Sequence, residues 1–190
     1  MLDKIIEFDK NLFIFLNNLG SKPFDGIWLL LTNQLNWTPF FLLLLVILYK
    51  KIGPKQLLIA MLIVTVMITF SDQTINLIKN TVQRLRPCND EELIGLIRVV
   101  KDSETFSYFS GHAANSIAAM MFIYLILRKH YKYSYLIFLY PLIFAYSRIY
   151  LGLHFPLDIL SGYLFGSLVG ILFYRIYIII SSKMKTETKN

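Results

Sequence analysis

KQLLIAMLIVTVMITFSDQTINLIKNTVQRLRP, residues 55–87, is the stretch that decides the fold. Its first part is apolar over enough residues to cross a bilayer as a helix. Polar side chains then recur at the period of one helix face; they are Asp72, Asn76, Lys79, Gln83 and Arg86. Because charged groups at membrane depth cost roughly 2.5 to 3.5 kcal/mol each, this stripe is predicted to face the interior of a helix bundle. For Asp72 and Asn76, a polar seam between helices fits as well as a functional role.

The composition places the whole chain in the membrane. Of its 190 residues 56% are hydrophobic, which is too apolar for an ordinary soluble domain. The net charge of +7 comes from basic residues that mostly flank apolar segments, so membrane lipids are expected as partners and nucleic acid is excluded. The N-terminal MLDKIIEFDK lacks a basic stretch leading into an apolar run, so a cleavable signal peptide is not expected. The single Cys88 indicates neither an intramolecular disulfide nor a metal site.

We therefore predict an all-α fold, a polytopic membrane helical bundle built from one domain over residues 1–182. Residues 1–34 mix charged and apolar side chains, which is typical of helices that lie in the membrane interface. Five segments are expected to cross the membrane, at about residues 36–51, 55–80, 112–129, 134–151 and 156–180. The long polar connection, residues 87–111, is predicted to be an active-site loop. Residues 183–190 are expected to form a short, disordered basic tail.

An up-and-down path through five spans brings three polar clusters to one membrane face. These clusters are Lys79-x6-Arg86-Pro87, Ser110-Gly111-His112 and Ser147-Arg148-x5-His154-x3-Asp158. The opposite face is rich in basic residues and has a single acid, Glu187; its bases are Lys50, Lys51, Lys55, Arg128, Lys129, Lys132, Lys183, Lys185 and Lys189. Because loops rich in Lys and Arg stay in the cytoplasm, the clusters are expected to face the periplasm or exterior of a bacterial inner membrane.

The first cluster has the chemistry of a phosphate site. Pro87 biases Arg86 away from the helical conformation, so the helix is predicted to end there and the guanidinium to turn into the site. The planar fork of arginine can hold a phosphate through two hydrogen bonds, and Lys79 adds a compact positive charge.

The second cluster stands at the start of an apolar helix. Ser110 alone fits a helix cap, and His112 alone fits an interfacial histidine. Gly111 would allow a ligand to approach the backbone closely, and the free N–H groups at a helix start form an anion site. The combination favours a bound phosphate.

The third cluster has the most specific spacing. Pro156 fits the first turn of a helix, which places His154 at the helix entrance and Asp158 one turn further on. A carboxylate at this spacing can hold one imidazole nitrogen and leave the other free as a nucleophile. Arg148 arrives from the preceding helix end as a third cation.

The three clusters together resemble the signature motifs of the type 2 phosphatidic acid phosphatase (PAP2) superfamily, which also includes vanadium-dependent haloperoxidases. The resemblance implies that His154 is the nucleophile that forms a phosphohistidine, that Asp158 orients it, and that His112 protonates the leaving oxygen. It also implies phosphate contacts from Lys79, Arg86, Ser110, Gly111 and Arg148, and it implies no metal or other cofactor. The chain departs from the family pattern at Phe109, where a proline is common.

The function implied is hydrolysis of a lipid phosphate or pyrophosphate at the membrane interface. Undecaprenyl pyrophosphate, phosphatidylglycerol phosphate, phosphatidic acid and a lipid A phosphate are all candidate substrates. Two alternatives remain: a phosphotransferase that passes the phosphoryl group to another lipid, and a lipid-phosphate transporter without turnover. The sequence leaves the oligomeric state open. The repeat of Gly162, Gly166 and Gly170 predicts close helix packing inside the bundle, with dimerisation as a weaker interpretation.

Overall fold

The computed structural model describes residues 2–187, and this part of the chain contains helices and no strand. The α-helices are α1 (Leu2–Asn18), α2 (Asp25–Leu31), α3 (Thr38–Val82), α4 (Gly111–Leu127), α5 (Leu139–Tyr150) and α6 (Pro156–Glu187). Short 3-10 turns occupy Lys22–Phe24, Gln34–Trp37, Pro87–Asn89, Glu91–Leu93 and Ser134–Phe138. The predicted all-α class is confirmed.

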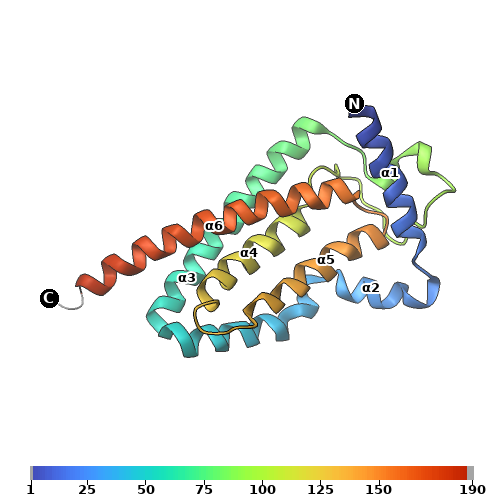
Figure 1. The fold of residues 1–190 in the computed structure, drawn as a ribbon. Helices are drawn as coiled ribbons and strands as arrows, with labels where there is room; N and C mark the ends of the chain where they lie inside the picture. The colour runs from blue at the N-terminus through green and yellow to red at the C-terminus, as the bar shows by residue number, and fades with distance from the viewer. Residues whose placement is uncertain (1, 188–190) are drawn as a thin grey trace.

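Helix α3 bends sharply near its middle. Gly53 has φ 77° and ψ 169°, a conformation that glycine adopts without a steric penalty, and Pro54 follows it. The bend divides α3 into two arms that diverge in a V (Figure 1). The predicted spans 36–51 and 55–80 lie largely along these two arms.

Helix α4 forms the centre of the bundle and packs most extensively against α6. The glycine repeat of α6 makes this contact: a Cβ atom built on Gly166 would lie 2.1 Å from the carbonyl oxygen of Ala114. The glycine repeat therefore allows α6 to pack closely against α4 within the bundle, as predicted. Two regions are long and apolar enough to cross a membrane, Gln34–Leu93 and Pro156–Met184, and α4 is a shorter apolar helix.

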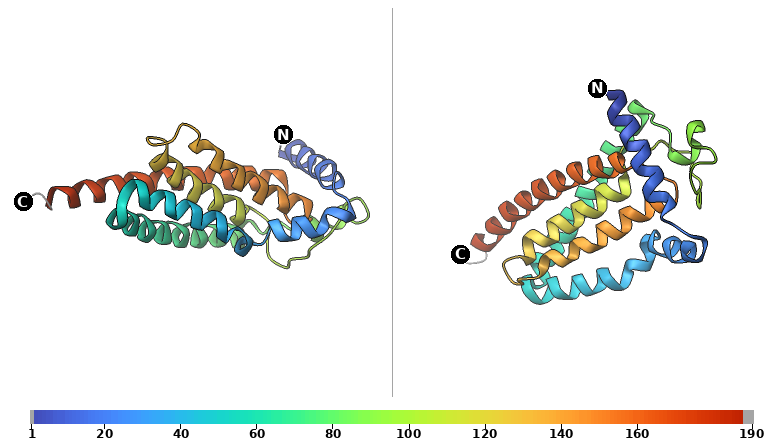
Figure 2. Two further views of the ribbon diagram at one scale, coloured as in Figure 1. Left: turned by 90° about the horizontal axis from the view of Figure 1, so that it is seen from below. Right: turned by 45° about the vertical axis from the view of Figure 1, so that its right-hand side comes forward.

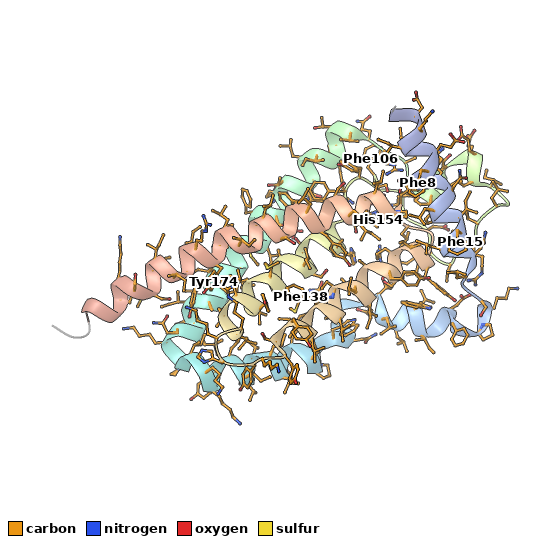
Figure 3. All side chains as sticks on the ribbon, viewed as in Figure 1. Phe8, Phe15, Phe106, Phe138, His154 and Tyr174 are labelled. Atoms are coloured by element: carbon orange, nitrogen blue, oxygen red, sulfur yellow. The ribbon has the colours of Figure 1, made fainter. Side chains whose placement is uncertain are left out.

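Helix α1 lies across the end of the bundle where α6 begins, as two further views also show (Figure 2). Its inward face carries the buried side chains of Asp9, Phe13 and Asn17. Its outward side exposes large apolar side chains, among them Phe8 and Phe15 (Figure 3), beside polar residues such as Lys4 and Glu7. This arrangement suits a helix that covers the bundle on one side and contacts lipid on the other.

The structure corrects three details of the sequence prediction. Helix α3 ends at Val82 because Gln83 adopts a left-handed conformation (φ 51°), so the polar stripe does not reach Arg86 as one helix face. The predicted span 134–151 begins with a 3-10 turn, and α5 starts only at Leu139. The tail is not disordered from residue 183, because α6 continues to Glu187 while Met184 packs against the core.

Candidate active site

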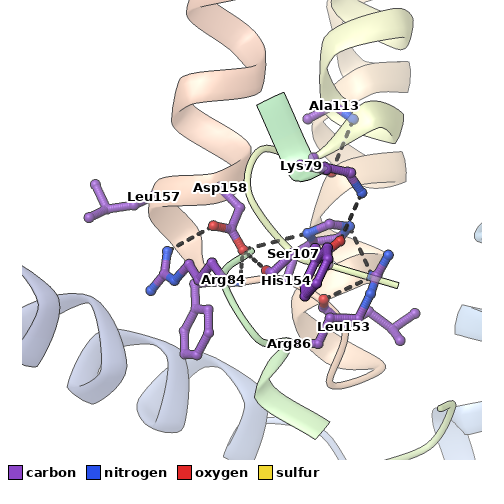
Figure 4. A network of polar contacts seen from close by, with 12 residues as sticks. Lys79, Arg84, Arg86, Ser107, Ala113, Leu153, His154, Leu157 and Asp158 are labelled. Carbon is purple, nitrogen blue, oxygen red and sulfur yellow. Dashed lines mark hydrogen bonds and ion pairs between the residues drawn. The ribbon is translucent and has the colours of Figure 1, made fainter. Parts of the chain in front are cut away.

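The three predicted clusters meet at the end of the bundle that α1 covers. The end of α3, the start of α4, the end of α5 and the start of α6 converge there (Figure 1). Figure 4 shows the polar network that results, with Lys79, Arg86, His154 and Asp158 in one group. The tertiary structure thus joins residues that are up to 79 positions apart, from Lys79 to Asp158.

Arg86 lies at the centre of this network and is only 5% exposed. Its backbone is extended (φ −78°, ψ 156°), as expected for a residue before proline. Its Nε donates to the carbonyl of Thr105 at 2.8 Å, and Nη1 donates to the carbonyl of Leu153 at 3.0 Å. Nη1 also lies 3.2 Å from Nε2 of His154. Arg86 therefore ties the loop 87–111 to the histidine.

His154 and Asp158 have the relative placement that their spacing predicts. The two side chains are almost completely buried, and His154 Nδ1 faces Asp158 Oδ2 at 3.5 Å, an electrostatic contact longer than a hydrogen bond. Burial lowers the pKa of His154 to about 3, although the Asp158 carboxylate acts in the opposite direction. The imidazole is therefore neutral near pH 7, and its Nε2 can carry a free electron pair toward Arg86.

Asp158 is held by several donors at once. Its Oδ2 accepts hydrogen bonds from the Ser107 hydroxyl and from the Phe155 backbone N–H, the latter at 2.9 Å. Its Oδ1 accepts from Arg84 Nη1 at 2.8 Å. The carboxylate is consequently fixed in position before any substrate binds.

Arg84 and Asp9 are site residues that the sequence did not identify. Arg84 Nη2 lies 2.6 Å from Asp9 Oδ2, so one guanidinium joins two buried carboxylates (Figure 4 shows its bond to Asp158). The guanidinium carbon also lies 4.0 Å from the centre of the Phe155 ring. Asp9 Oδ1 in turn accepts from the backbone N–H of Leu157 at 2.9 Å, at the start of α6. Burial raises the pKa of Asp9, and Arg84 opposes this effect. Arg84 lies between Lys79 and Arg86 in the sequence, but the spacing of the first cluster does not distinguish it from the other basic residues of the chain.

Two further cations surround the histidine. Lys79 Nζ donates to the carbonyl of Phe106 at 3.0 Å. Arg148 is 6% exposed, and its Nη1 donates to Thr32 Oγ1 at 2.8 Å. Its Nε is buried and has no hydrogen-bond partner among residues 2–187, so a donor remains for a bound anion. Ser147 points elsewhere, because its hydroxyl donates to the Phe144 carbonyl.

The second cluster begins α4 beside these cations. Ser110 is fully buried and caps the helix: its Oγ accepts from the Ala113 N–H at 3.4 Å, and its own N–H donates to the Asp158 carbonyl at 2.9 Å. A Cβ atom on Gly111 would make only ordinary contacts, 3.7 Å from the nearest atom of Ile75, so protein packing does not demand glycine there. The ring of His112 lies 5.2 Å from that of Phe144.

A cavity of about 620 Å³ adjoins the site on the side of His112. It lies between the two arms of α3 and the helices α4 and α5, and most of its lining residues are apolar. The site therefore combines a buried cationic pocket with an adjoining apolar space. Such a combination can hold an anion whose remaining part is hydrophobic. No group of three or more His, Cys, Asp or Glu side chains in the described part of the chain is arranged to hold a metal ion.

Known proteins share both the sequence and the fold. Residues 56–180 match the family model of the PAP2 superfamily. A lipid A 4'-phosphatase from Bacteroides thetaiotaomicron is 32% identical over 99% of this chain and 85% of its own length. An undecaprenyl-diphosphatase from Sulfolobus acidocaldarius is 29% identical over 90% of this chain and 79% of its own length.

Among solved structures, a transmembrane PAP2-type phosphatidylglycerolphosphate phosphatase from Bacillus subtilis has the same fold. The TM-score is 0.67 at 20% identity, covering 91% of this chain and 86% of that one. The three similar proteins have three different lipid substrates in their names, so similarity alone leaves the substrate undecided.

Proposed function

The chain belongs to the PAP2 superfamily, and from this premise we propose that it removes the phosphate of a lipid A-type monoester through a phosphohistidine intermediate. The chain is a membrane hydrolase of phosphoric ester or anhydride bonds, and its relatives act on lipid phosphates. The placement of His154 between Asp158 and Arg86 is the observation that supports a phosphohistidine intermediate. Its Nδ1 faces the carboxylate at 3.5 Å, and its Nε2 lies 3.2 Å from the guanidinium that would bind phosphate.

The first half of the proposed reaction transfers the phosphoryl group to the enzyme. The electron pair of His154 Nε2 attacks phosphorus while the bond from phosphorus to the leaving oxygen breaks. His112 donates a proton to that oxygen, so the product leaves as an alcohol. Lys79, Arg86 and Arg148 stabilise the charge on the other phosphoryl oxygens, together with the Ser110 hydroxyl and the Gly111 backbone N–H at the start of α4.

The second half regenerates the enzyme. A water molecule attacks the phosphohistidine, the bond from phosphorus to Nε2 breaks, and neutral His112 accepts the water proton. Inorganic phosphate then leaves. Throughout, Asp158 holds the Nδ1–H of His154, and Arg84 with Asp9 holds Asp158.

The choice of lipid rests on sequence similarity. The lipid A 4'-phosphatase covers nearly the whole chain at 32% identity, including α1, which the family model does not reach. Undecaprenyl pyrophosphate, phosphatidylglycerol phosphate and phosphatidic acid are the substrates to test against it. We further propose that the site faces the periplasm or exterior of a bacterial inner membrane. The two faces have equally many Lys and Arg residues, but three of those on the site face belong to the clusters and the rest lie among acids, whereas those of the opposite face lie in short segments with a single acid.

Phosphate release by the purified protein tests this function. The full chain in detergent is given each of the four lipids without any acceptor lipid, and inorganic phosphate is measured. We expect the fastest release from the lipid A-type monoester. Release that requires an added acceptor lipid would instead identify a phosphotransferase, and binding without release would identify a transporter.

A further inference from the structure

The cavity beside His112 runs along the second arm of α3. Leu57 lines its far part and Asp72 lines the part near His112. These two residues are fifteen positions apart on one helix, which corresponds to about 22 Å. The cavity is therefore deep enough to accept an apolar chain, and it begins at the predicted proton donor.

Asp72 is an exception to the apolar lining. Among the described residues that line the cavity it is the one carboxylate, and its side chain is exposed. Asn115 on α4 holds it, because Asn115 Nδ2 donates to Asp72 Oδ1 at 2.6 Å. The hydroxyl of Ser71, which is buried, donates to Asn115 Oδ1 at 2.6 Å and fixes the amide. No described residue donates to Oδ2 of Asp72, so this oxygen of a cavity-lining residue can still accept a hydrogen bond.

The Asp72–Asn115 pair lies near the expected path of the leaving group of the substrate. In phosphoryl transfer the attacking atom, here His154 Nε2, and the leaving oxygen lie roughly in line on opposite sides of phosphorus. A leaving oxygen opposite His154 would lie toward His112, which lines the cavity. Asn115 follows His112 by three positions and so shares its helix face. The atoms of the leaving group next to the scissile bond would therefore lie beside Asn115 and Asp72, and its hydrophobic remainder would lie in the apolar part of the cavity.

We propose that Asp72, held by Asn115, selects the leaving group of the substrate. A carboxylate only accepts hydrogen bonds, so it favours a headgroup with hydroxyl or amide donors next to the scissile oxygen. An acylated amino sugar has such donors. A diphosphate presents a second phosphate at the same place, which the like charge of Asp72 repels. The proposal rests on the proposed function. It narrows the substrate to phosphate monoesters whose lipid headgroup has hydrogen-bond donors, in preference to polyprenyl diphosphates.

A purely structural role makes a different prediction. If the pair only joins α3 to α4, then a neutral amide at position 72 serves equally well, because it can still accept the hydrogen bond from Asn115. A test must therefore change the charge of Asp72 while its hydrogen bond to α4 is kept.

The experiment compares two substrates for the full chain in detergent, an acylated glucosamine 4-phosphate and undecaprenyl diphosphate. We measure kcat/KM for each with the wild type, Asp72→Asn, Asp72→Ser and Asp72→Glu. The uncharged variants should lower the monoester-to-diphosphate ratio by about tenfold or more, since a hydrogen bond to a charged group is worth about one such factor. Asp72→Glu keeps the charge and should stay close to the wild-type ratio.

Ser71→Ala is the matched control, because it removes a hydrogen bond from the same seam without touching the charge. It should change kcat/KM for both lipids by the same factor. The proposal is overturned if the uncharged variants also change both lipids equally, or if the ratio rises. If one uncharged variant does not fold, the other decides. A wild-type protein that releases phosphate from neither lipid would refute the proposed function itself.

Discussion

Nη1 of Arg84 lies 2.8 Å from Oδ1 of Asp158, and the same guanidinium reaches Asp9 on α1. The contact occupies the Asp158 oxygen that faces away from His154, so Oδ2 is left to face the imidazole. The N-terminal helix thereby takes part in orienting the proposed nucleophile, although it lies outside the residues that match the family model.

Replacing Arg84 by Met should therefore lower both stability and kcat. Loss of one partner from a buried ion pair costs about 3–5 kcal/mol, because an uncompensated charge stays buried. In the double variant Asp9→Asn/Arg84→Met one of the two unpaired carboxylates is gone, so part of the thermal stability should return. The kcat should not return, since Asp158 still lacks its partner. Equal recovery of stability and kcat would show that Arg84 acts on folding alone.

Replacing His154 by Ala should abolish turnover while the protein stays folded. The proposed role of His154 is contact with the substrate, whereas Arg86, Asp158 and Ser110 hold the helix ends around it. Wild type incubated with labelled lipid phosphate and quenched in alkaline detergent should carry a phosphoryl group that later acid treatment releases, and the variant should carry none. A labelled His154→Ala protein would assign the nucleophile to another residue.

Replacing His112 by Gln should affect substrates according to their leaving group. General acid catalysis typically contributes about 10²–10⁴-fold, because an alkoxide is a poor leaving group. We expect a loss of that size with a lipid monoester and a much smaller loss with an aryl phosphate, whose leaving group is stable without a proton. Equal losses on both substrates would argue that His112 binds phosphate and does not donate a proton.

The buried imidazole of His154 should make stability depend on pH. Its pKa is about 3 in the fold and near 6.5 in the unfolded chain, so below pH 6.5 the unfolded chain binds a proton that the fold does not. The stabilisation is complete above about pH 6.5 and is lost toward pH 3, at about 1.4 kcal/mol per pH unit. Between pH 7 and 5 the wild type should lose more thermal stability than His154→Gln. Parallel losses would contradict a neutral, buried His154.

Replacing Gly166 by Ala should separate α6 from α4. The new methyl group would meet the Ala114 carbonyl oxygen at 2.1 Å, and overpacking of this kind costs about 1–3 kcal/mol. Gly26→Ala is the matched control, because a Cβ there has nothing within 4 Å. Thermal unfolding should show a loss for Gly166→Ala only. A similar melting temperature for both variants would mean that the helices can move apart freely.

The proposed orientation can be tested by labelling a single cysteine. In a Cys88→Ser background, Ile94→Cys places a thiol on the loop 87–111 at a residue that is 78% exposed. A membrane-impermeant maleimide should label it in intact spheroplasts. Labelling only after the membrane is broken would place the site on the cytoplasmic side.

The sequence by itself determined the helical class and singled out the eight residues proposed for the site. These follow from local spacing: apolar runs of membrane length, and motifs such as His154-x3-Asp158 whose geometry is set within one helix turn. The same holds for Gly162, Gly166 and Gly170, whose spacing already predicted close packing.

Only the tertiary structure showed what lies between distant segments. The ion pair of Arg84 with Asp9 joins residues 75 positions apart, and the contact of Asn115 with Asp72 joins residues 43 apart. No periodicity encodes such pairs, because each partner taken alone looks like an ordinary surface charge or a helix seam. The break between the two arms of α3 was predicted from the sequence, whereas the end of α3 at Val82, ahead of Arg86, was seen only in the structure. Local spacing thus singled out the residues proposed to bind phosphate, while packing determined which side chains hold them in place.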